Sequence, residues 1–233
     1  MRPSAVVEAW GLSAQVSIGV DRRTLYDGVD LSVVDGESVA IVGRSGSGKT
    51  TLLSTLGLMQ KPENGRLSIG GRDVSTLSQT AAARLRNELV GFVFQTYSLL
   101  PQLNVFENVA VPLRYGSRVK QLTIRSRVMS SLALVGLADR AKEKTTRLSG
   151  GEQQRVAIAR ALVREPKVVL ADEPTGALDG DTANQVLDAL QRATRHAGSC
   201  LIVVTHDPEV ARVMDRAVQL HPNGLYPAKL GKG

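Results

Sequence analysis

The sequence has 233 residues, enough for one large domain with a well-buried core, although length alone does not exclude two small ones. Hydrophobic residues make up 42% and charged residues 22%, as in ordinary globular proteins, whereas only 3% aromatic residues disfavour modules that stack nucleic-acid bases on several exposed rings. The formal net charge is +7, but the basic residues are spread along the chain, which favours a solvated surface over a dedicated nucleic-acid patch.

The first predicted elements are short strands. Alternating segments before Gly36 and around Leu67 to Ile69 indicate a small antiparallel sheet at the edge of the fold. Val39 to Val42 is an apolar run typical of a buried strand. A glycine-rich turn follows it, and then a helix-compatible stretch from Lys49 to Met59.

The turn between that strand and that helix matches the Gly-x-x-x-x-Gly-Lys-Ser/Thr phosphate loop. It reads Gly43-Arg44-Ser45-Gly46-Ser47-Gly48-Lys49-Thr50, with Thr51 next. Its glycines let successive amide groups and the helix N-terminus point at a polyphosphate. Lys49 is expected to neutralise the β- and γ-phosphates and Thr50 to ligate Mg²⁺. The competing reading, a Gly/Ser turn that caps a helix, does not require the full match.

The middle of the chain is predicted to be helical. From about Asn104 to Arg147 the apolar residues are spaced for one helix face, which suggests an inserted helical lobe. Those residues are Val128, Leu132, Val135 and Leu137.

Two further buried strands are predicted, at Val168 to Ala171 and Leu201 to Val204, so the alternation of strands and helices favours a parallel sheet covered on both faces. Asp172 and Glu173 follow the first strand and are expected beside the phosphate loop, where open α/β sheets bind ligands. Asp172 is predicted to hold Mg²⁺ and Glu173 to act as general base. Without the phosphate loop, an acidic strand end would more often be a helix cap or a solvated loop.

The single cysteine, Cys200, adjoins the second strand, so neither a disulfide within the chain nor a zinc cluster is expected. A reducing cytosol fits this cysteine usage. We expect no signal peptide and no spanning helix, because no run approaches the roughly 18 apolar residues that a span requires.

A second glycine-containing motif carries a family resemblance. Ser149, Gly150 and Gly151 lie at a predicted helix start and form a second anion cradle, yet one ATP cannot fill both cradles of one chain. The whole motif, Leu148-Ser149-Gly150-Gly151-Glu152-Gln153-Gln154-Arg155, resembles the signature of ABC ATPases. The resemblance implies that Ser149 and Gly151 contact the γ-phosphate of ATP held by a second copy of the chain.

Other family motifs occur in the same order. Gln95, after Val90 to Phe94, resembles the Q-loop glutamine of the Mg²⁺ shell. Ala177 to Asp179 resembles the D-loop that crosses the dimer interface, and His206 resembles the switch histidine that senses the γ-phosphate. The resemblance thus implies ATP and Mg²⁺ as ligands, with Glu173, His206 and Lys49 in catalysis. His196 and His221 are predicted to be surface residues.

One part of the sequence departs from the family pattern. Members usually stack adenine on an aromatic residue about two dozen positions before the phosphate loop, where this chain reads Val16-Ser17-Ile18-Gly19-Val20. Trp10 lies too early and Tyr26 too late. Either an aliphatic contact replaces stacking or a shift in register hides the aromatic residue, which leaves the selectivity for ATP over GTP open.

Taken together, the resemblance implies a single ABC ATPase domain over residues 1–233. Its α/β fold has a mostly parallel phosphate-loop sheet, an antiparallel edge subdomain and a helical subdomain at about 98–160. The expected function is a dimeric ATPase, peripheral on the cytoplasmic face of the membrane, that drives an integral membrane permease subunit. Several stretches resemble the bacterial ATPases of lipoprotein release, macrolide or peptide export and cell division.

Two other functions stay open from sequence alone. A soluble ABC ATPase acting on nucleic acid or the ribosome is compatible with the +7 charge, although no nucleic-acid partner is expected, since such proteins usually carry two cassettes, zinc-binding cysteines or a long coiled coil. A small-molecule kinase would explain the phosphate loop but would leave Ser149 to Gly151 without a task.

Overall fold

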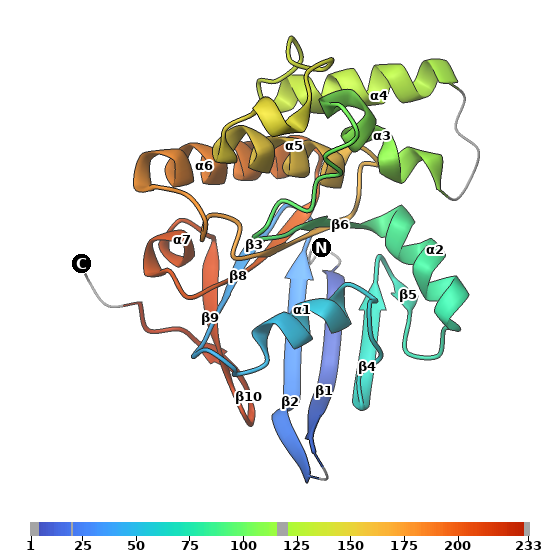
Figure 1. Cartoon of the computed structure of the whole chain (residues 1–233). Helices are drawn as coiled ribbons and strands as arrows, with labels where there is room; N and C mark the ends of the chain where they lie inside the picture. The colour runs from blue at the N-terminus through green and yellow to red at the C-terminus, as the bar shows by residue number, and fades with distance from the viewer. Residues whose placement is uncertain (1–4, 20, 116–120, 231–233) are drawn as a thin grey trace.

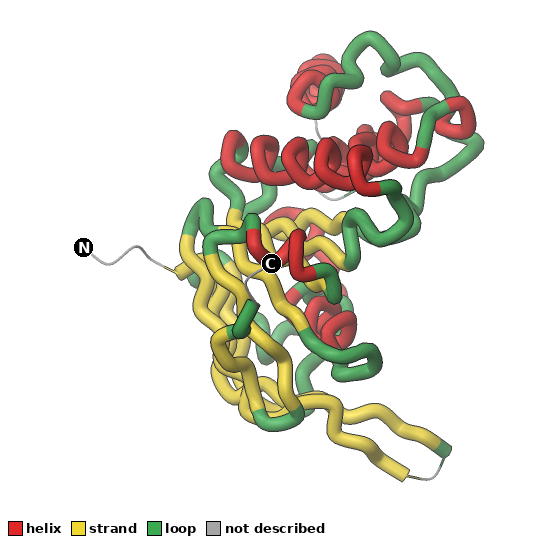
Figure 2. The backbone as a smooth tube through the Cα atoms, turned by 90° about the vertical axis from the view of Figure 1, so that its left-hand side faces the viewer, coloured by secondary structure: helices red, strands yellow, loops and turns green. Residues whose placement is uncertain are grey.

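The computed structural model of the chain describes residues 5–19, 21–115 and 121–230. It begins with a long antiparallel hairpin of β1 (Ala5–Ile18) and β2 (Asp21–Val34). With β4 (Asn64–Ile69) and β5 (Arg72–Asp73) the hairpin forms a four-stranded sheet in the order β2-β1-β4-β5. The end of the hairpin projects from the body of the molecule (Figure 2). The predicted antiparallel sheet is therefore present, with strands much longer than the short segments expected.

A six-stranded sheet forms the centre, in the order β10-β9-β3-β8-β7-β6. All of its strand pairs are parallel except β9 with β10. The strands span Ser38–Val42 (β3), Val90–Val93 (β6), Val168–Asp172 (β7), Cys200–Thr205 (β8), Arg216–His221 (β9) and Gly224–Pro227 (β10). β3, β7 and β8 coincide with the three buried apolar runs of the sequence, extended by a residue at one or both ends.

Successive residues of the central strands point into two different cores. In β7, Val169 and Ala171 pack with the helical side of the molecule, whereas Val168 and Leu170 pack with α1 and the antiparallel sheet. All four side chains are fully buried. This burial on both faces is the reason that the parallel strands read as continuous rather than alternating apolar runs.

The helices occupy both faces of the central sheet. On one face α3, α4, α5 and α6 form a layer, and α1 lies on the other face beside the hairpin strands (Figure 1). Their bounds are Lys49–Leu56 (α1), Gln79–Leu89 (α2), Val105–Arg114 (α3), Gln121–Leu134 (α4), Gly150–Leu162 (α5), Gly180–His196 (α6) and Pro208–Arg212 (α7), with a 3₁₀ turn η1 at Thr145–Arg147.

The prediction of a helix from Lys49 to Met59 was wrong at its C-terminal end, because α1 stops at Leu56. Gly57 caps the helix, and Leu58 takes a left-handed conformation with φ 58°. A Cβ atom at Gly57 would lie 1.9 Å from the Phe92 ring, so only glycine fits where β6 passes the helix end.

Two other boundaries differ from prediction. Val135 and Leu137 were assigned to the same helix face as Val128 and Leu132, but α4 ends at Leu134. All four are nevertheless buried, since the chain after α4 folds back into the same core. The expected strand at Val90 to Phe94 ends one residue early, at Val93.

A membrane span was not expected from the sequence. Within residues 5–19, 21–115 and 121–230, no helix combines the length and the apolar character that crossing a bilayer requires.

Candidate active site

The phosphate loop connects β3 to α1, as predicted. Gly46 and Gly48 adopt left-handed conformations, with φ 72° and 93°, which turn the backbone around the Lys49 side chain. The Lys49 ammonium group donates to the carbonyl oxygens of Gly43, at 2.9 Å, and Arg44, at 3.0 Å. Lys49 is largely buried and, within the described part of the chain, forms no ion pair. Its charge is thus available to an anionic ligand in the loop.

Thr50 and Asp172 lie together at the metal position that the sequence predicts. The Thr50 hydroxyl donates to Oδ1 of Asp172 at 3.5 Å, across 122 residues of sequence. Burial, and to a lesser degree the neighbouring Glu173, raise the pKa of Asp172, against the lowering effects of the Thr50 hydroxyl and Lys49. The two oxygen ligands are of the hard type that Mg²⁺ prefers.

Glu173 is held between two residues at the end of β8. Its Oε1 lies 2.7 Å from Nδ1 of His206, and its Oε2 accepts from the Thr205 hydroxyl at 3.1 Å. The Glu173 side chain is only 16% exposed, whereas that of His206 is 72% exposed. Glu173 also has φ 45°, an uncommon conformation for a residue with a side chain. The two candidate catalytic residues are therefore in direct contact.

Gln95 lies beyond the end of β6 and is exposed. Its amide nitrogen is close to the loop after Glu173, because a Cβ atom at Gly176 would lie 3.0 Å from Nε2 of Gln95. Gly176 therefore leaves room for the Gln95 side chain beside the segment that carries Glu173.

The signature residues begin α5. The Ser149 side chain accepts from the Glu152 amide, and the Glu152 carboxylate accepts from the Ser149 amide, so the two form a capping box. A Cβ atom at Gly151 would lie 2.3 Å from Cγ2 of Thr182, in the first turn of α6. The side chain of Asp179 caps α6 by accepting from the Thr182 amide at 3.0 Å. The signature and the D-loop are thus packed together.

The phosphate loop and the signature are separate in this chain. Among the described residues, no hydrogen bond or ion pair joins Ser149–Gly151 to Gly43–Thr51. Figure 1 shows α1 and α5 on opposite sides of the central sheet. The structure therefore brings Lys49, Thr50, Asp172, Glu173 and His206 to one edge of the sheet and leaves the signature apart from them.

ATP and Mg²⁺ fit the first of these two groups. The phosphate loop offers an unpaired ammonium group, and the Ser47 hydroxyl is buried without a hydrogen-bond partner in the described part of the chain. Among the described residues no cluster of three or more His, Cys, Asp or Glu side chains could hold a metal ion alone. Mg²⁺ is commonly bound by one or two protein ligands together with substrate phosphates, and the adjacent Thr50 and Asp172 side chains offer two such oxygens.

Val16 lies where a base-stacking residue was sought. It is 39% exposed and lines a cleft of about 230 Å³ with Leu25, Gly46, Gly48 and Lys49 to Thr51. Tyr26 is fully buried beneath Gly48, and its hydroxyl lies 3.3 Å from that of Thr55. Trp10 is exposed but lines a different cleft, with Asp30 and Tyr226. Neither aromatic residue can therefore stack in the cleft beside the phosphate loop, which favours the aliphatic contact.

Two of the remaining predictions concern histidines outside the site. His196 is exposed at the end of α6, as expected. His221 is half-buried, its ring packs edge-on against Tyr226, and it lines a cleft with Arg44 and Arg23. The prediction that His221 is simply a surface residue was therefore incomplete.

Cys200 is buried at the start of β8, and burial raises its pKa to about 12.

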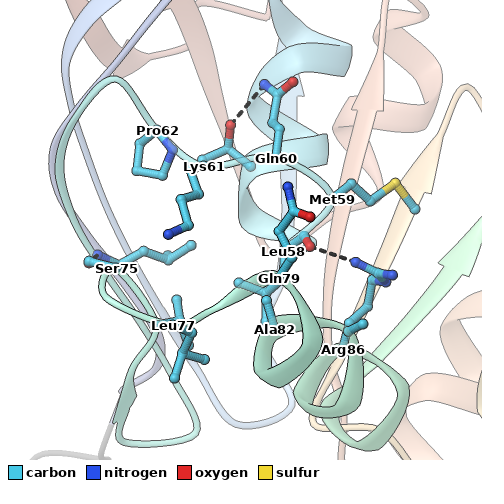
Figure 3. Close-up of a pocket in the computed structure, with 14 residues that line it drawn as sticks. Leu58, Met59, Gln60, Lys61, Pro62, Ser75, Leu77, Gln79, Ala82 and Arg86 are labelled. Carbon is cyan, nitrogen blue, oxygen red and sulfur yellow. Dashed lines mark hydrogen bonds between the residues drawn. The ribbon is translucent and has the colours of Figure 1, made fainter.

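Two neighbouring clefts lie beside α2, outside the phosphate site. One, of about 440 Å³, is lined by the end of α1, β4 and α2, and there Arg86 donates to the Leu58 carbonyl oxygen at 2.6 Å (Figure 3). The other, of about 580 Å³, lies between α2, β6, α3 and α5. Met59, Ala83 and Arg86 line both, so the two clefts form one groove.

The contacts that two residues make around the candidate site were not predicted from the sequence. Thr205 precedes His206 and reaches Glu173, and its place at a strand end beside a candidate catalytic residue was the available signal. Gln154 is fully buried within α5, and its position in the signature motif gave no indication of its partners.

Comparisons with known proteins identify the family of this chain. The model of a family described as ABC transporter matches residues 26–176. The chain is 44% identical over 217 residues to the lipoprotein-releasing system ATP-binding protein LolD of Geobacter metallireducens, over 93% of this chain and 96% of the relative. It is 41% identical over 215 residues to YknY of Bacillus subtilis, an uncharacterised ABC transporter ATP-binding protein. The match covers 92% of this chain and 93% of YknY.

Solved structures show the same fold. The dimeric structure of MJ0796, a bacterial ABC transporter cassette, superposes with a TM-score of 0.84 at 35% identity, over 97% of this chain and all of that chain. The dimeric structure of a post-hydrolysis state of MJ0796 bound to ADP and Pi gives the same values. The predicted phosphate-loop α/β fold is therefore confirmed.

Proposed function

This chain belongs to the ABC transporter family and is an ATPase subunit of that family, and on this premise we propose that two copies form an ATP-driven motor for a membrane protein. The observation that carries the proposal is the separation of the two anion cradles. The phosphate loop and the signature of one chain lie on different parts of the molecule, so a second copy is needed to bring a signature to each phosphate loop.

Within each half-site, the phosphate loop holds the nucleotide. Arg44, Ser45 and the glycines of Gly43–Thr50 supply backbone amides, and Lys49 supplies the positive charge. Bound Mg²⁺ would neutralise charge on the transferred phosphate, and Thr50, Asp172 and Gln95 are the residues that would hold it. Thr51 lines the cleft of about 230 Å³ that also contains Val16, beside the phosphate loop.

The reaction itself depends on Glu173 and His206. Glu173 acts as the general base toward water, and His206 and Thr205 hold its carboxylate in place through the contacts at 2.7 and 3.1 Å. The low exposure of the Glu173 side chain, 16%, strengthens these interactions, since the local dielectric is lower than that of water.

The signature completes the site of the partner copy. Gly150 and Gly151 present the backbone amides of the first turn of α5, beside the Ser149 hydroxyl, where the helix dipole favours an anion. Asp179, in the loop packed against this signature, lies at the same interface. Closure of the dimer is thus favoured by a γ-phosphate and is lost once that phosphate leaves.

The groove, which consists of the cleft in Figure 3 and the larger cleft beside it, is the docking site for the membrane partner. The larger cleft is lined by apolar side chains such as Met59, Phe92 and Val111. Its cations, Arg86, Arg160 and Arg164, donate to backbone carbonyl oxygens. Among the described residues that line either cleft, none is acidic, so these charges suit an amphipathic segment that carries carboxylates.

The membrane protein determines what the motor moves. We infer export, extraction or mechanotransmission at the cytoplasmic membrane, since the relative in Geobacter metallireducens is described as part of a lipoprotein-releasing system. In this arrangement the whole chain acts as a single ATPase unit at the inner face of the membrane, and its helical subdomain contacts the partner.

The dimer is tested with Glu173→Gln, which removes the base but keeps the shape of the side chain. We expect ATP hydrolysis to fall by about 10²–10⁴-fold. Gel filtration with ATP should show a stable dimer, and with ADP a monomer. A variant that hydrolyses ATP at the normal rate, or that stays monomeric with ATP, would exclude the proposed role of Glu173 or the shared site.

Docking is tested with Val111→Glu, which places a negative charge among the residues that line the larger cleft. We expect it to weaken co-purification of the integral membrane partner from solubilised membranes of cells that express this chain, while Kd for ADP stays normal. The matched control is Val213→Glu, because Val213 is exposed at the end of α7 and outside the groove. Equal binding of the two variants would contradict docking at this site.

A further inference from the structure

Gln154 connects three functional segments from inside the protein. Its side chain is fully buried in the first half of α5. The amide nitrogen donates to the carbonyl oxygen of Pro174 at 2.6 Å and to that of Phe94 at 3.2 Å. Pro174 follows Glu173 directly, and Phe94 directly precedes Gln95. One amide group of the signature helix therefore holds the backbone next to both residues.

Arg160 makes a second connection between the same helix and the Q-loop. Its guanidinium group donates to the carbonyl oxygens of Ser98, at 2.6 Å, and Tyr97, at 2.8 Å. Burial lowers the pKa of Arg160, so this cation is held in an environment that disfavours charge. Tyr97 and Ser98 have φ 54° and 49°, a conformation that side chains disfavour. The Arg160 fork thus holds a strained turn in place.

The Q-loop also reaches back to the signature itself. A Cβ atom at Gly150 would lie 2.8 Å from the hydroxyl oxygen of Tyr97. The Tyr97 ring therefore lies against the first glycine of the second anion cradle. Residues in both halves of α5 therefore contact the segments that carry Gln95 and Glu173.

We propose that Gln154 and Arg160 couple the two ATP sites of the dimer. This inference depends on the proposed shared site, in which Glu173 and Gln95 act on one ATP and Ser149 of the same chain acts on the other. Since a helix moves as a rigid unit, a displacement of the signature displaces the carbonyl groups that Gln154 and Arg160 hold. Both are positioning residues, because the groups they touch are backbone carbonyls rather than substrate.

The test uses Gln154→Met, which keeps the length and volume of the side chain but removes both donors. We expect ATP turnover to fall at least tenfold. Added to Glu173→Gln, it should raise the ATP concentration needed for dimerisation at least tenfold. The Kd for ADP, which the phosphate loop of one chain binds, should stay within twofold. The matched control is Gln191→Met, which removes a similar side-chain bond to the Val213 carbonyl outside the site.

Each other outcome opposes the inference. If turnover and dimerisation both stay normal, or if only one of them changes, the helix does not couple the sites. If ADP affinity falls in step with turnover, Gln154 is needed only for the fold. Should Gln154→Met fail to fold, Arg160→Lys decides by the same criteria, because it keeps the charge and loses the fork. If Glu173→Gln alone stays monomeric with ATP, the shared site is wrong and this inference fails with it.

Discussion

Nδ1 of His206 lies 2.7 Å from Oε1 of Glu173, although 33 residues separate them in sequence. The parallel register of β7 and β8, in which Asp172 is opposite Val204, brings the two strand ends together. Glu173 is turned toward His206 by its left-handed backbone, with φ 45°. The contact therefore follows from sheet register and from one strained residue.

Replacement of this histidine should reduce turnover without loss of nucleotide binding. His206→Ala leaves the Glu173 carboxylate with only the Thr205 hydroxyl, so the base is no longer held in one orientation. We expect kcat to fall by about 10²-fold, as when a reacting group is misplaced by an ångström. His196→Ala, at an exposed position on α6, is the control. Equal rates for the two variants would show that the contact has no catalytic part.

Asp172 should reduce the stability of the nucleotide-free protein. Burial raises its pKa, so the folded state disfavours the carboxylate relative to the unfolded chain. Such a group stabilises the fold most below its unfolded pKa, and this contribution is lost as the pH rises through the folded value. At pH 7 we therefore expect Asp172→Asn to raise Tm, by about 2–4 °C for each kcal/mol gained.

The pH dependence of Tm and the ATPase activity of Asp172→Asn distinguish this explanation from others. The gain in Tm should shrink as the pH falls and disappear below about 3.9, the ordinary pKa of an aspartate in an unfolded chain, because the carboxyl group is then protonated in both states. The same variant should lose Mg²⁺-dependent ATP hydrolysis. Asp188→Asn, on the exposed face of α6, should change stability by less than about 0.5 kcal/mol. A lower Tm for Asp172→Asn at pH 7 would contradict the argument.

Ser149 has two roles that one substitution can separate. As N-cap of α5 it accepts from the Glu152 amide, and Ser149→Ala should cost about 1 kcal/mol of stability. Ser149→Asp keeps a good cap, and its charge suits the helix N-terminus, so Tm should stay near that of the wild type. The same charge would repel a γ-phosphate. We therefore expect Ser149→Asp to fold normally and to form no ATP-dependent dimer in gel filtration.

The sequence predicted the parts of the site that stand at strand ends. Buried apolar runs located β3, β7 and β8, and the parallel sheet then placed Lys49, Asp172, Glu173 and His206 at a common edge. The motif order supplied the rest, including the separation of Ser149 from the phosphate loop.

Features that depend on tertiary contacts could not be predicted. The end of α1 is set by the Phe92 ring against Gly57, which is 35 residues away. The partners of Gln154 are backbone carbonyls, and any sequence provides these at every position. The same is true of Arg160, whose neighbours in the motif do not indicate that it holds the Q-loop.

Val16 should make the nucleotide site tolerant of the base. Its side chain and that of Leu25 offer the cleft aliphatic contacts, and such contacts do not distinguish adenine from guanine. We expect kcat/KM for ATP and GTP to lie within about tenfold of each other.

An aromatic ring stacks on a base with about 1–3 kcal/mol, and the lower end of that range corresponds to a Kd tighter by about fivefold. Val16→Tyr should therefore strengthen ATP binding by about that factor or more. Val213→Tyr, at an exposed valine outside the cleft, should leave Kd unchanged. If Val16→Tyr binds ATP no better than the wild type, the base lies elsewhere.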